Sequence, residues 1–172
     1  MTLDRFETAH LRGERLSVAH LPEIRRLHSD AAVMALLGGV RSEAATAAYL
    51  DRNLAHWKRY GHGIYILRDR AHDAVVGLGC LRHLSLDNQD EIEIGYLFSP
   101  SYWGRGLGTE VARACIELGF GQLDAPSLVA ITHPDNRASR RVMEKAGMQF
   151  ERDAQLDDQP IVVYRIWQGD VR

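Results

Sequence analysis

The sequence is poor in cysteine and has no long apolar segment. Only Cys80 and Cys115 are present, each inside an apolar run, which predicts buried thiols and no zinc site. No stretch approaches the roughly 18 apolar residues of a membrane span, and the start Met-Thr-Leu-Asp-Arg-Phe-Glu lacks the apolar centre of a signal peptide. These absences predict a protein of the reducing cytoplasm that binds neither a membrane nor a metal.

A charge excess of either sign is also missing. The chain has 21 Lys and Arg against 23 Asp and Glu, for a net charge of −2 and a pI near 6.4, which argues against a nucleic-acid partner. With 172 residues, 45% of them hydrophobic, the chain is long enough to bury a continuous core. We therefore expect one domain over residues 1–172.

Hydrophobic periodicity predicts a mixed order of helices and strands. The expected elements are a bent strand or hairpin within 6–19, short helices within 22–37, a helix over 42–60, strands over 63–68, 74–84 and 91–98, a helix after 108, a strand over 127–132, a helix over 136–146, and closing strands near 150 and over 161–166. Short turns after 68 and a turn over 87–90 predict an antiparallel meander. The fold class is therefore α/β (α+β), with one largely antiparallel central sheet flanked by helices.

A glycine-rich loop follows the strand over 91–98. Pro100 ends that strand, and Gly104, Gly106 and Gly108 then precede a helical apolar pattern. Glycines allow a ligand close to the backbone, and free N–H groups at a helix N-terminus attract anions. The loop is therefore predicted to hold a phosphorylated ligand.

Two familiar phosphate loops do not fit. A Walker loop requires Lys followed by Ser or Thr after its last glycine, whereas Thr109 and Glu110 follow Gly108. A Rossmann fingerprint has the spacing Gly-x-Gly-x-x-Gly after the first strand of a parallel sheet. Here the spacing is Gly-x-Gly-x-Gly, in the middle of the chain and after a meander.

The loop instead resembles the acetyl-coenzyme A loop of the GNAT N-acetyltransferases. The resemblance rests on Tyr102-Trp103-Gly104-Arg105-Gly106-Leu107-Gly108-Thr109-Glu110 after Glu93-Ile94-Gly95-Tyr96, and on a second block from Asn136 to Met148. It is most similar to the ribosomal-protein N-acetyltransferase (Rim-type) branch, in which a tryptophan at the position of Trp103 is familiar. The order of elements matches the family fold over nearly the whole chain.

The resemblance implies a site for acetyl-coenzyme A. Amides from Gly104 to Thr109, including that of Leu107, would bind the pyrophosphate, next to Trp103, and Arg105 would add a charged contact. The pantetheine arm would lie between two splayed strands, one ending at Phe98 and the other at Thr132, with Leu97 and Phe98 bracketing the thioester.

The second block supplies two further candidates by resemblance. Asn136 would bond to the pantetheine arm, although it also fits a helix N-cap. Ser139, three residues later and on the same helix face, would sit near the sulfur and donate a proton to it. Many relatives carry a tyrosine deeper in this helix, and this chain has none there.

The acceptor amine also has to lose a proton. Glu93 is the preferred general base because it lies on the strand leading to the thioester, where burial favours a basic carboxylate. A solvent-facing carboxylate is the alternative. Glu91, on the same strand face, is expected to attract a cationic substrate, and His83 and His133 are rival bases.

The sequence thus predicts an acetyl-coenzyme A-dependent N-acetyltransferase that acts on a primary amine by direct attack. A protein N-terminus is the leading acceptor. Polyamines, amino acids and aminoglycosides stay open, as does a non-catalytic acyl-coenzyme A sensor. Whether the chain forms a homodimer is also left open.

Overall fold

The computed structural model describes residues 1–170. Thirteen helices and strands follow one another, with three short 3-10 turns at Val18–His20, Pro100–Tyr102 and Gln168–Asp170. The elements are β1 (Arg5–Glu7), β2 (Leu11–Arg15), α1 (Leu21–His28), α2 (Ala31–Met34), α3 (Glu43–Tyr60), β3 (Ile64–Asp69), β4 (Val75–Leu86), β5 (Gln89–Phe98), α4 (Leu107–Gly121), β6 (Ser127–Thr132), α5 (Arg137–Lys145), β7 (Gln149–Leu156) and β8 (Gln159–Trp167).

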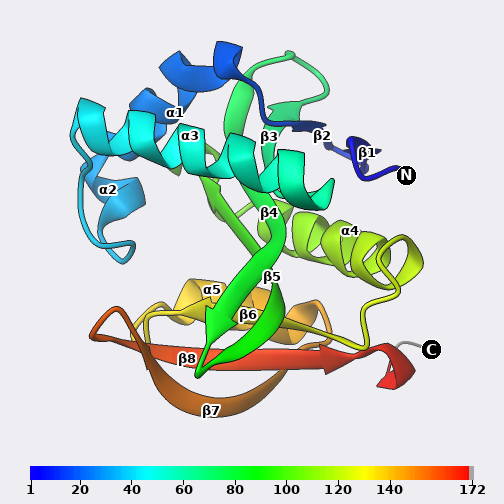
Figure 1. Cartoon of the computed structure of the whole chain (residues 1–172). Helices are drawn as coiled ribbons and strands as arrows, with labels where there is room; N and C mark the ends of the chain where they lie inside the picture. The colour runs from blue at the N-terminus through cyan, green and yellow to red at the C-terminus, as the bar shows by residue number, and fades with distance from the viewer. Residues whose placement is uncertain (171–172) are drawn as a thin grey trace.

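All eight strands form one sheet in the order β1-β2-β3-β4-β5-β6-β8-β7 (Figure 1). Every neighbouring pair is antiparallel except β5 and β6, which are parallel and connected through α4. Parallel neighbours need a crossover connection, whereas antiparallel neighbours need only a turn. The predicted mixed, largely antiparallel sheet flanked by helices is confirmed.

The hairpin between β4 and β5 is tighter than the sequence predicted. Leu86 pairs with Gln89, so the turn is only Asp87 and Asn88 rather than 87–90. Both residues have positive φ, 51° and 60°, which suits the twist of a two-residue hairpin and which Asp and Asn tolerate best among non-glycine residues. The ladder therefore extends β4 and β5 beyond their predicted ends.

Helix α3 begins and ends at residues that the sequence marks clearly. The Ser42 hydroxyl accepts a hydrogen bond from the N–H of Ala45, and Gly61 closes the helix with φ 72°. Side-chain caps satisfy N–H groups that have no partner inside the helix, and glycine adopts left-handed backbone without a Cβ clash. The predicted helix over 42–60 is confirmed.

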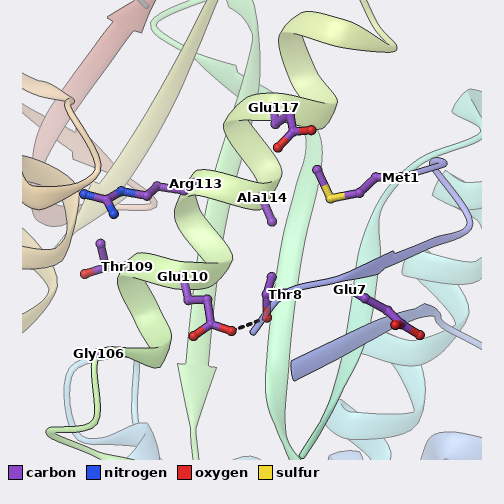
Figure 2. Close-up of a pocket in the computed structure, with 9 residues that line it drawn as sticks. All are labelled: Met1, Glu7, Thr8, Gly106, Thr109, Glu110, Arg113, Ala114 and Glu117. Atoms are coloured by element: carbon purple, nitrogen blue, oxygen red, sulfur yellow. Dashed lines mark hydrogen bonds between the residues drawn. The ribbon is translucent and has the colours of Figure 1, made fainter. Parts of the chain in front are cut away.

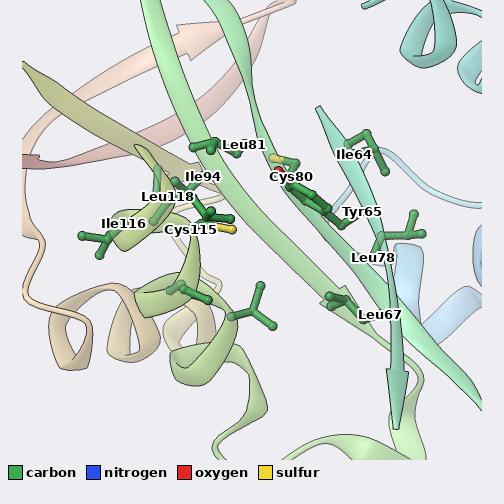
Figure 3. Close-up of a cluster of buried hydrophobic side chains, with 14 of the residues drawn as sticks. Ile64, Tyr65, Leu67, Leu78, Cys80, Leu81, Ile94, Cys115, Ile116 and Leu118 are labelled. Atoms are coloured by element: carbon green, nitrogen blue, oxygen red, sulfur yellow. The ribbon is translucent and has the colours of Figure 1, made fainter. Parts of the chain in front are cut away.

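The helices cover opposite faces of the central strands. A Cβ built on Gly79 would lie 3.2 Å from Val111 of α4, so Gly79 faces α4. Its neighbour Cys80 faces the other side, because side chains alternate along a strand. Figure 3 shows Leu81 with Cys115 on the α4 side, and both cysteines are free and buried. Within residues 1–170, no helix is long and apolar enough to cross a membrane.

Candidate active site

Two parallel strands separate in the middle of the sheet. β5 and β6 share only the register pair Glu93 with Val129, although β5 continues to Phe98 and β6 to Thr132. On its other edge β5 stays paired with β4, where Phe98 lies opposite Gly77. Within residues 1–170, backbone groups on the inner edges beyond Glu93 have no strand partner, and an extended ligand can bind to such groups as an added strand.

At the end of β5, the backbone rather than the Phe98 ring is turned toward this opening. The Phe98 side chain is buried in the core, and a Cβ on Gly77 would come within 2.9 Å of its ring. The Phe98 carbonyl accepts a hydrogen bond from the Trp103 indole N–H at 2.8 Å. Leu97 is half-buried. Of the two residues predicted to lie beside the thioester, Leu97 has an accessible side chain, whereas Phe98 has only its backbone near the opening.

The loop between β5 and α4 is built around Trp103. Besides its indole bond to Phe98, its backbone N–H donates to the carbonyl of Pro100, and the residue is 52% exposed. The Arg105 guanidinium lies 4.8 Å from the centroid of the Tyr102 ring, a distance at which cation and ring attract. Arg105 therefore stays close to the loop while its donors face solvent.

Gly104 and Gly106 have backbone conformations that favour glycine. Their φ angles are 74° and 78°, and a Cβ at either position would meet nothing within 4 Å. Gly106 is the N-cap of α4 and has no side chain to cap the first turn, in contrast to α3, which Ser42 caps. The N–H groups at the start of α4, including those of Leu107 and Thr109, are thus left for a ligand, and the helix dipole favours an anion there.

Gly108 serves packing, which differs from the role expected for all three glycines. A Cβ on Gly108 would lie 3.3 Å from a methyl of Val142 and 3.5 Å from the Tyr96 ring. Because Val142 belongs to α5, a side chain here would push α4 and α5 apart. Gly108 therefore brings the start of α4 close to α5 and β5.

The start of α5 carries the two candidates from the second block. The Asn136 carboxamide oxygen accepts from the N–H of Ser139 at 3.1 Å, so the N-cap alternative is confirmed and its NH2 group remains to donate. The Ser139 hydroxyl lies 3.1 Å from the hydroxyl of Tyr96. That tyrosine also donates to the Ser139 carbonyl at 3.1 Å.

Tyr96 contacts the candidate residue Ser139, and sequence reasoning gave it no role in the site. Its ring lies on the apolar face of β5, and the pattern alone gave it only a packing role. Burial raises its pKa to about 12, partly opposed by the bond to Ser139, so the phenol stays neutral and can donate. Two residues 43 apart in sequence thus form a hydroxyl pair, and no local sequence pattern predicts this contact.

Glu93 lies at the point where β5 and β6 separate. It is buried, with 6% of its surface exposed, so the solvent-facing alternative is excluded. Its Oε2 accepts from Nε of Arg82 at 2.7 Å, and Arg82 is its register partner on β4. Attraction to Glu93 is the main cause that raises the Arg82 pKa. The other oxygen, Oε1, has no protein partner within residues 1–170.

The alternative charged residues are held elsewhere. Glu91 forms two bonds of 2.6 and 2.9 Å to Arg165 of β8, so the expectation that it attracts a cationic substrate is wrong. His83 lies 3.0 Å from the Asp90 carboxylate. His133 lies after β6, where its Nδ1 accepts from the N–H of Asp135.

A cavity with a volume of about 400 Å³ lies between α4 and the N-terminal strands and shares Gly106 and Thr109 with the glycine loop (Figure 2). It is lined by Met1, Glu7, Thr8, Gly106, Thr109, Glu110, Arg113, Ala114 and Glu117. Glu110 accepts from the hydroxyl of Thr8 and the N–H of His10. Burial of Glu110 is outweighed by these bonds, which lower its pKa. The Glu110 carboxylate therefore holds the turn between β1 and β2 against α4.

Comparison with known proteins identifies the family. Residues 11–149 match the family model described as "Acetyltransferase (GNAT) domain". The chain is similar to "Uncharacterized protein YkkB" of Bacillus subtilis, with 33% identity over 138 residues and 80% of each chain covered.

Solved structures agree with this match. The acetyltransferase from Agrobacterium tumefaciens superposes with a TM-score of 0.83 at 26% identity, covering 96% of this chain and 95% of that one. RimL, a ribosomal L7/L12 alpha-N-protein acetyltransferase in complex with coenzyme A, superposes with a TM-score of 0.76 at 18% identity, covering 93% and 95%. The latter likeness concerns the fold alone.

Proposed function

Because the chain belongs to the GNAT acetyltransferase family, it is an acetyl-coenzyme A-dependent N-acetyltransferase, and we propose that its acceptor is a primary amine that attacks directly between β5 and β6. The observation that carries this proposal is the separation of the two strands at Glu93, next to the uncapped start of α4. When bound, acetyl-coenzyme A supplies an acetyl group activated as a thioester. A protein N-terminus is our first candidate acceptor, on the Rim-type resemblance of the loop.

The loop and the two strands would hold the coenzyme. Amides from Gly104 to Thr109, including that of Leu107, would bind the pyrophosphate, and Trp103 and Arg105 would lie beside it. The inner edges of β5 and β6, at Leu97 and Phe98 on one side, would hold the pantetheine arm, and the NH2 group of Asn136 would donate to it. The fit is supported by positive φ at Gly104 and Gly106, where no Cβ stands between ligand and backbone.

Glu93 would take the proton of the acceptor amine. An ammonium has no lone pair to attack with, so a base has to remove its proton at Oε1, directly or through a water molecule. Arg82 holds the other oxygen and so fixes the direction in which Oε1 points. In this scheme Glu93 acts as a carboxylate that is paired with the Arg82 guanidinium.

Ser139 would supply a proton to the sulfur, with Tyr96 behind it. A serine hydroxyl alone is a weak acid, but the single Tyr96 proton, which is donated to the Ser139 carbonyl in the structure, can turn to Ser139 Oγ, 3.1 Å away, while Ser139 donates onward. As Ser139 gives its proton to the sulfur, it would take the proton of Tyr96, and the resulting phenolate would be reprotonated from solvent. The pair takes the place of the tyrosine that many relatives carry within the helix.

Turnover of acetyl-coenzyme A with a panel of amines tests the proposal. Release of free thiol should depend on both the protein and the amine, and mass spectrometry should find the amine heavier by one acetyl group. The panel contains peptides with free N-termini, amino acids, polyamines and an aminoglycoside. Each peptide is paired with its N-terminally blocked form as a control.

The outcomes separate the candidates. A protein that binds acetyl-coenzyme A tightly but acetylates no amine in the panel contradicts the enzyme proposal and favours the acyl-coenzyme A sensor. Acetylation of small amines but of no peptide N-terminus contradicts the protein acceptor alone.

A further inference from the structure

More cationic than anionic groups lie around Glu93. Among the charged groups that act most strongly on Tyr49 of α3 and on Arg41, which precedes α3, Glu93 is the one carboxylate within residues 1–170. The cations there are Arg82, which pairs with Glu93, and Arg41 and Arg52, which pair with no carboxylate. The positive potential therefore exceeds what one glutamate neutralises.

Arg41 is held in place without an anionic partner. The guanidinium of Arg41 lies 5.0 Å from the centroid of the Tyr49 ring. The backbone N–H of Arg41 donates to the His28 carbonyl at 3.0 Å. Within the described residues its only side-chain hydrogen bond goes to His28 Nε2 at 3.5 Å, near the limit for such a bond. Among residues 1–170, no carboxylate lies within ion-pair distance.

His28 does not offset this charge. The ring is buried beside the Thr46 hydroxyl, which lies 3.2 Å from its Nδ1. Burial and the neighbouring Arg41 lower the His28 pKa to about 4, so the ring is neutral at pH 7. A neutral Nε2 can accept from Arg41, and it orients the guanidinium without neutralising it.

Two further donors nearby lack acceptors. Arg82 uses Nε for Glu93, and its two terminal amino groups have no acceptor in the described chain, although the side chain is 31% exposed. The Tyr49 hydroxyl likewise has no partner there. Burial raises the Tyr49 pKa to about 12, so it is a donor at pH 7. Unpaired guanidinium donors that are partly buried favour a bound carboxylate, which they can contact at two points.

We infer that the acceptor carries a carboxylate in addition to its reacting amine, and that Arg41 and the terminal amino groups of Arg82 bind this carboxylate. The inference rests on the proposed function, because it places the amine at Glu93 Oε1. It names the substrate class as a zwitterion: an amino acid, or a peptide N-terminus followed by an acidic side chain. Polyamines and aminoglycosides, which carry only positive charge, would be repelled from these arginines.

Matched pairs of acceptors test the charge directly. One set pairs glycine, β-alanine and 4-aminobutyrate with their carboxamides, and a second pairs peptides with Asp or Glu at the second position with their Asn or Gln counterparts. Values of kcat/KM are corrected to the concentration of free amine. Among the pairs that react, the carboxylate member should be at least about tenfold better, as expected of a charge-assisted bond.

A variant links the preference to Arg41. In Arg41→Gln the ratio of carboxylate to carboxamide kcat/KM should fall toward one, and Arg41→Lys should keep part of it. Arg59→Gln is the matched control, because Arg59 also stacks on an aromatic ring, at 4.9 Å from the Tyr60 centroid, and lies outside this cluster. Coenzyme A affinity, measured by calorimetry, reports whether each variant is folded.

A binding measurement keeps this inference separate from the proposed function. Protein saturated with coenzyme A is titrated with 4-acetamidobutyrate, with its carboxamide, and with an acetylated acidic peptide. Tighter binding of the carboxylates, lost in Arg41→Gln, supports the anion site even if no amine is turned over, an outcome that would refute only the enzyme proposal. Equal binding of the carboxylate and carboxamide forms, binding of neither, or a polyamine as the best acceptor would overturn the inference.

Discussion

Replacement of Gly106 by alanine tests whether a ligand approaches the loop backbone. Gly106 has φ 78° and ψ 0° at the N-cap of α4, and a Cβ there would meet no protein atom within 4 Å. The cost of Gly106→Ala to the free protein is therefore backbone strain alone, about 1–2 kcal/mol for an L-residue in left-handed backbone. For a chain of this length, that lowers Tm by roughly 2–8 °C.

Gly61 provides a control with the same strain. Its φ is 72° and its ψ 11°, at the end of α3, and a Cβ there would also meet nothing within 4 Å. Gly61→Ala and Gly106→Ala should therefore lower Tm by similar amounts in differential scanning calorimetry. Only the second methyl would stand between a pyrophosphate and the first amides of α4.

Titration with coenzyme A separates the two effects. We expect Gly106→Ala to raise the Kd by at least about tenfold, or 1.4 kcal/mol, and Gly61→Ala to leave it unchanged. An unchanged Kd for Gly106→Ala refutes the assignment of the loop to the coenzyme. An equal rise in both variants means that loss of stability, and not contact with the ligand, weakens binding.

Three further predictions concern the chemistry and the pH dependence. Glu93→Gln should lower kcat by about a hundredfold or more and flatten the pH profile of kcat, with coenzyme affinity unchanged. The control, Glu91→Gln, should affect only Tm. An unaltered pH profile in Glu93→Gln means that another group is the base. Tyr96→Phe removes the hydroxyl bonded to Ser139 and should lower kcat about tenfold at constant coenzyme Kd, so a wild-type rate excludes the hydroxyl pair from proton transfer. The His28 pKa falls from 6.5 to about 4 on folding, so the unfolded chain binds a proton at a higher pH than the folded chain, and up to about 3 kcal/mol of stability is lost as pH falls from 6.5 toward 4. His28→Gln should weaken this pH dependence of Tm. A Tm that depends on pH as steeply as in the wild type contradicts the prediction.

Local sequence patterns determined most of the fold. Ser42 and Gly61 mark the ends of α3 because a cap and a left-handed glycine act within one turn of the helix. Alternating apolar residues and short turns indicated the meander, and the glycines indicated an anion site at the start of α4. Each of these signals depends on residues close together in the chain, so the sequence alone reveals it.

Tertiary structure decided which side chains meet. Arg82 reaches Glu93 through the register of β4 and β5, and Tyr96 reaches Ser139 from another element. Arg165 removes Glu91 from the site by pairing with it across the sheet. Such contacts depend on strand register and on the packing of distant segments, which no short pattern encodes.

The glycine loop shows both levels at once. The sequence by itself predicted a site for a phosphorylated ligand at this loop, because three alternating glycines before a helix imply close backbone approach. Only the tertiary structure distinguished Gly104 and Gly106, which have left-handed backbone, from Gly108, which makes room for Val142. The physical reason is that a backbone angle is a local property, whereas contact with α5 exists only once the helices have packed.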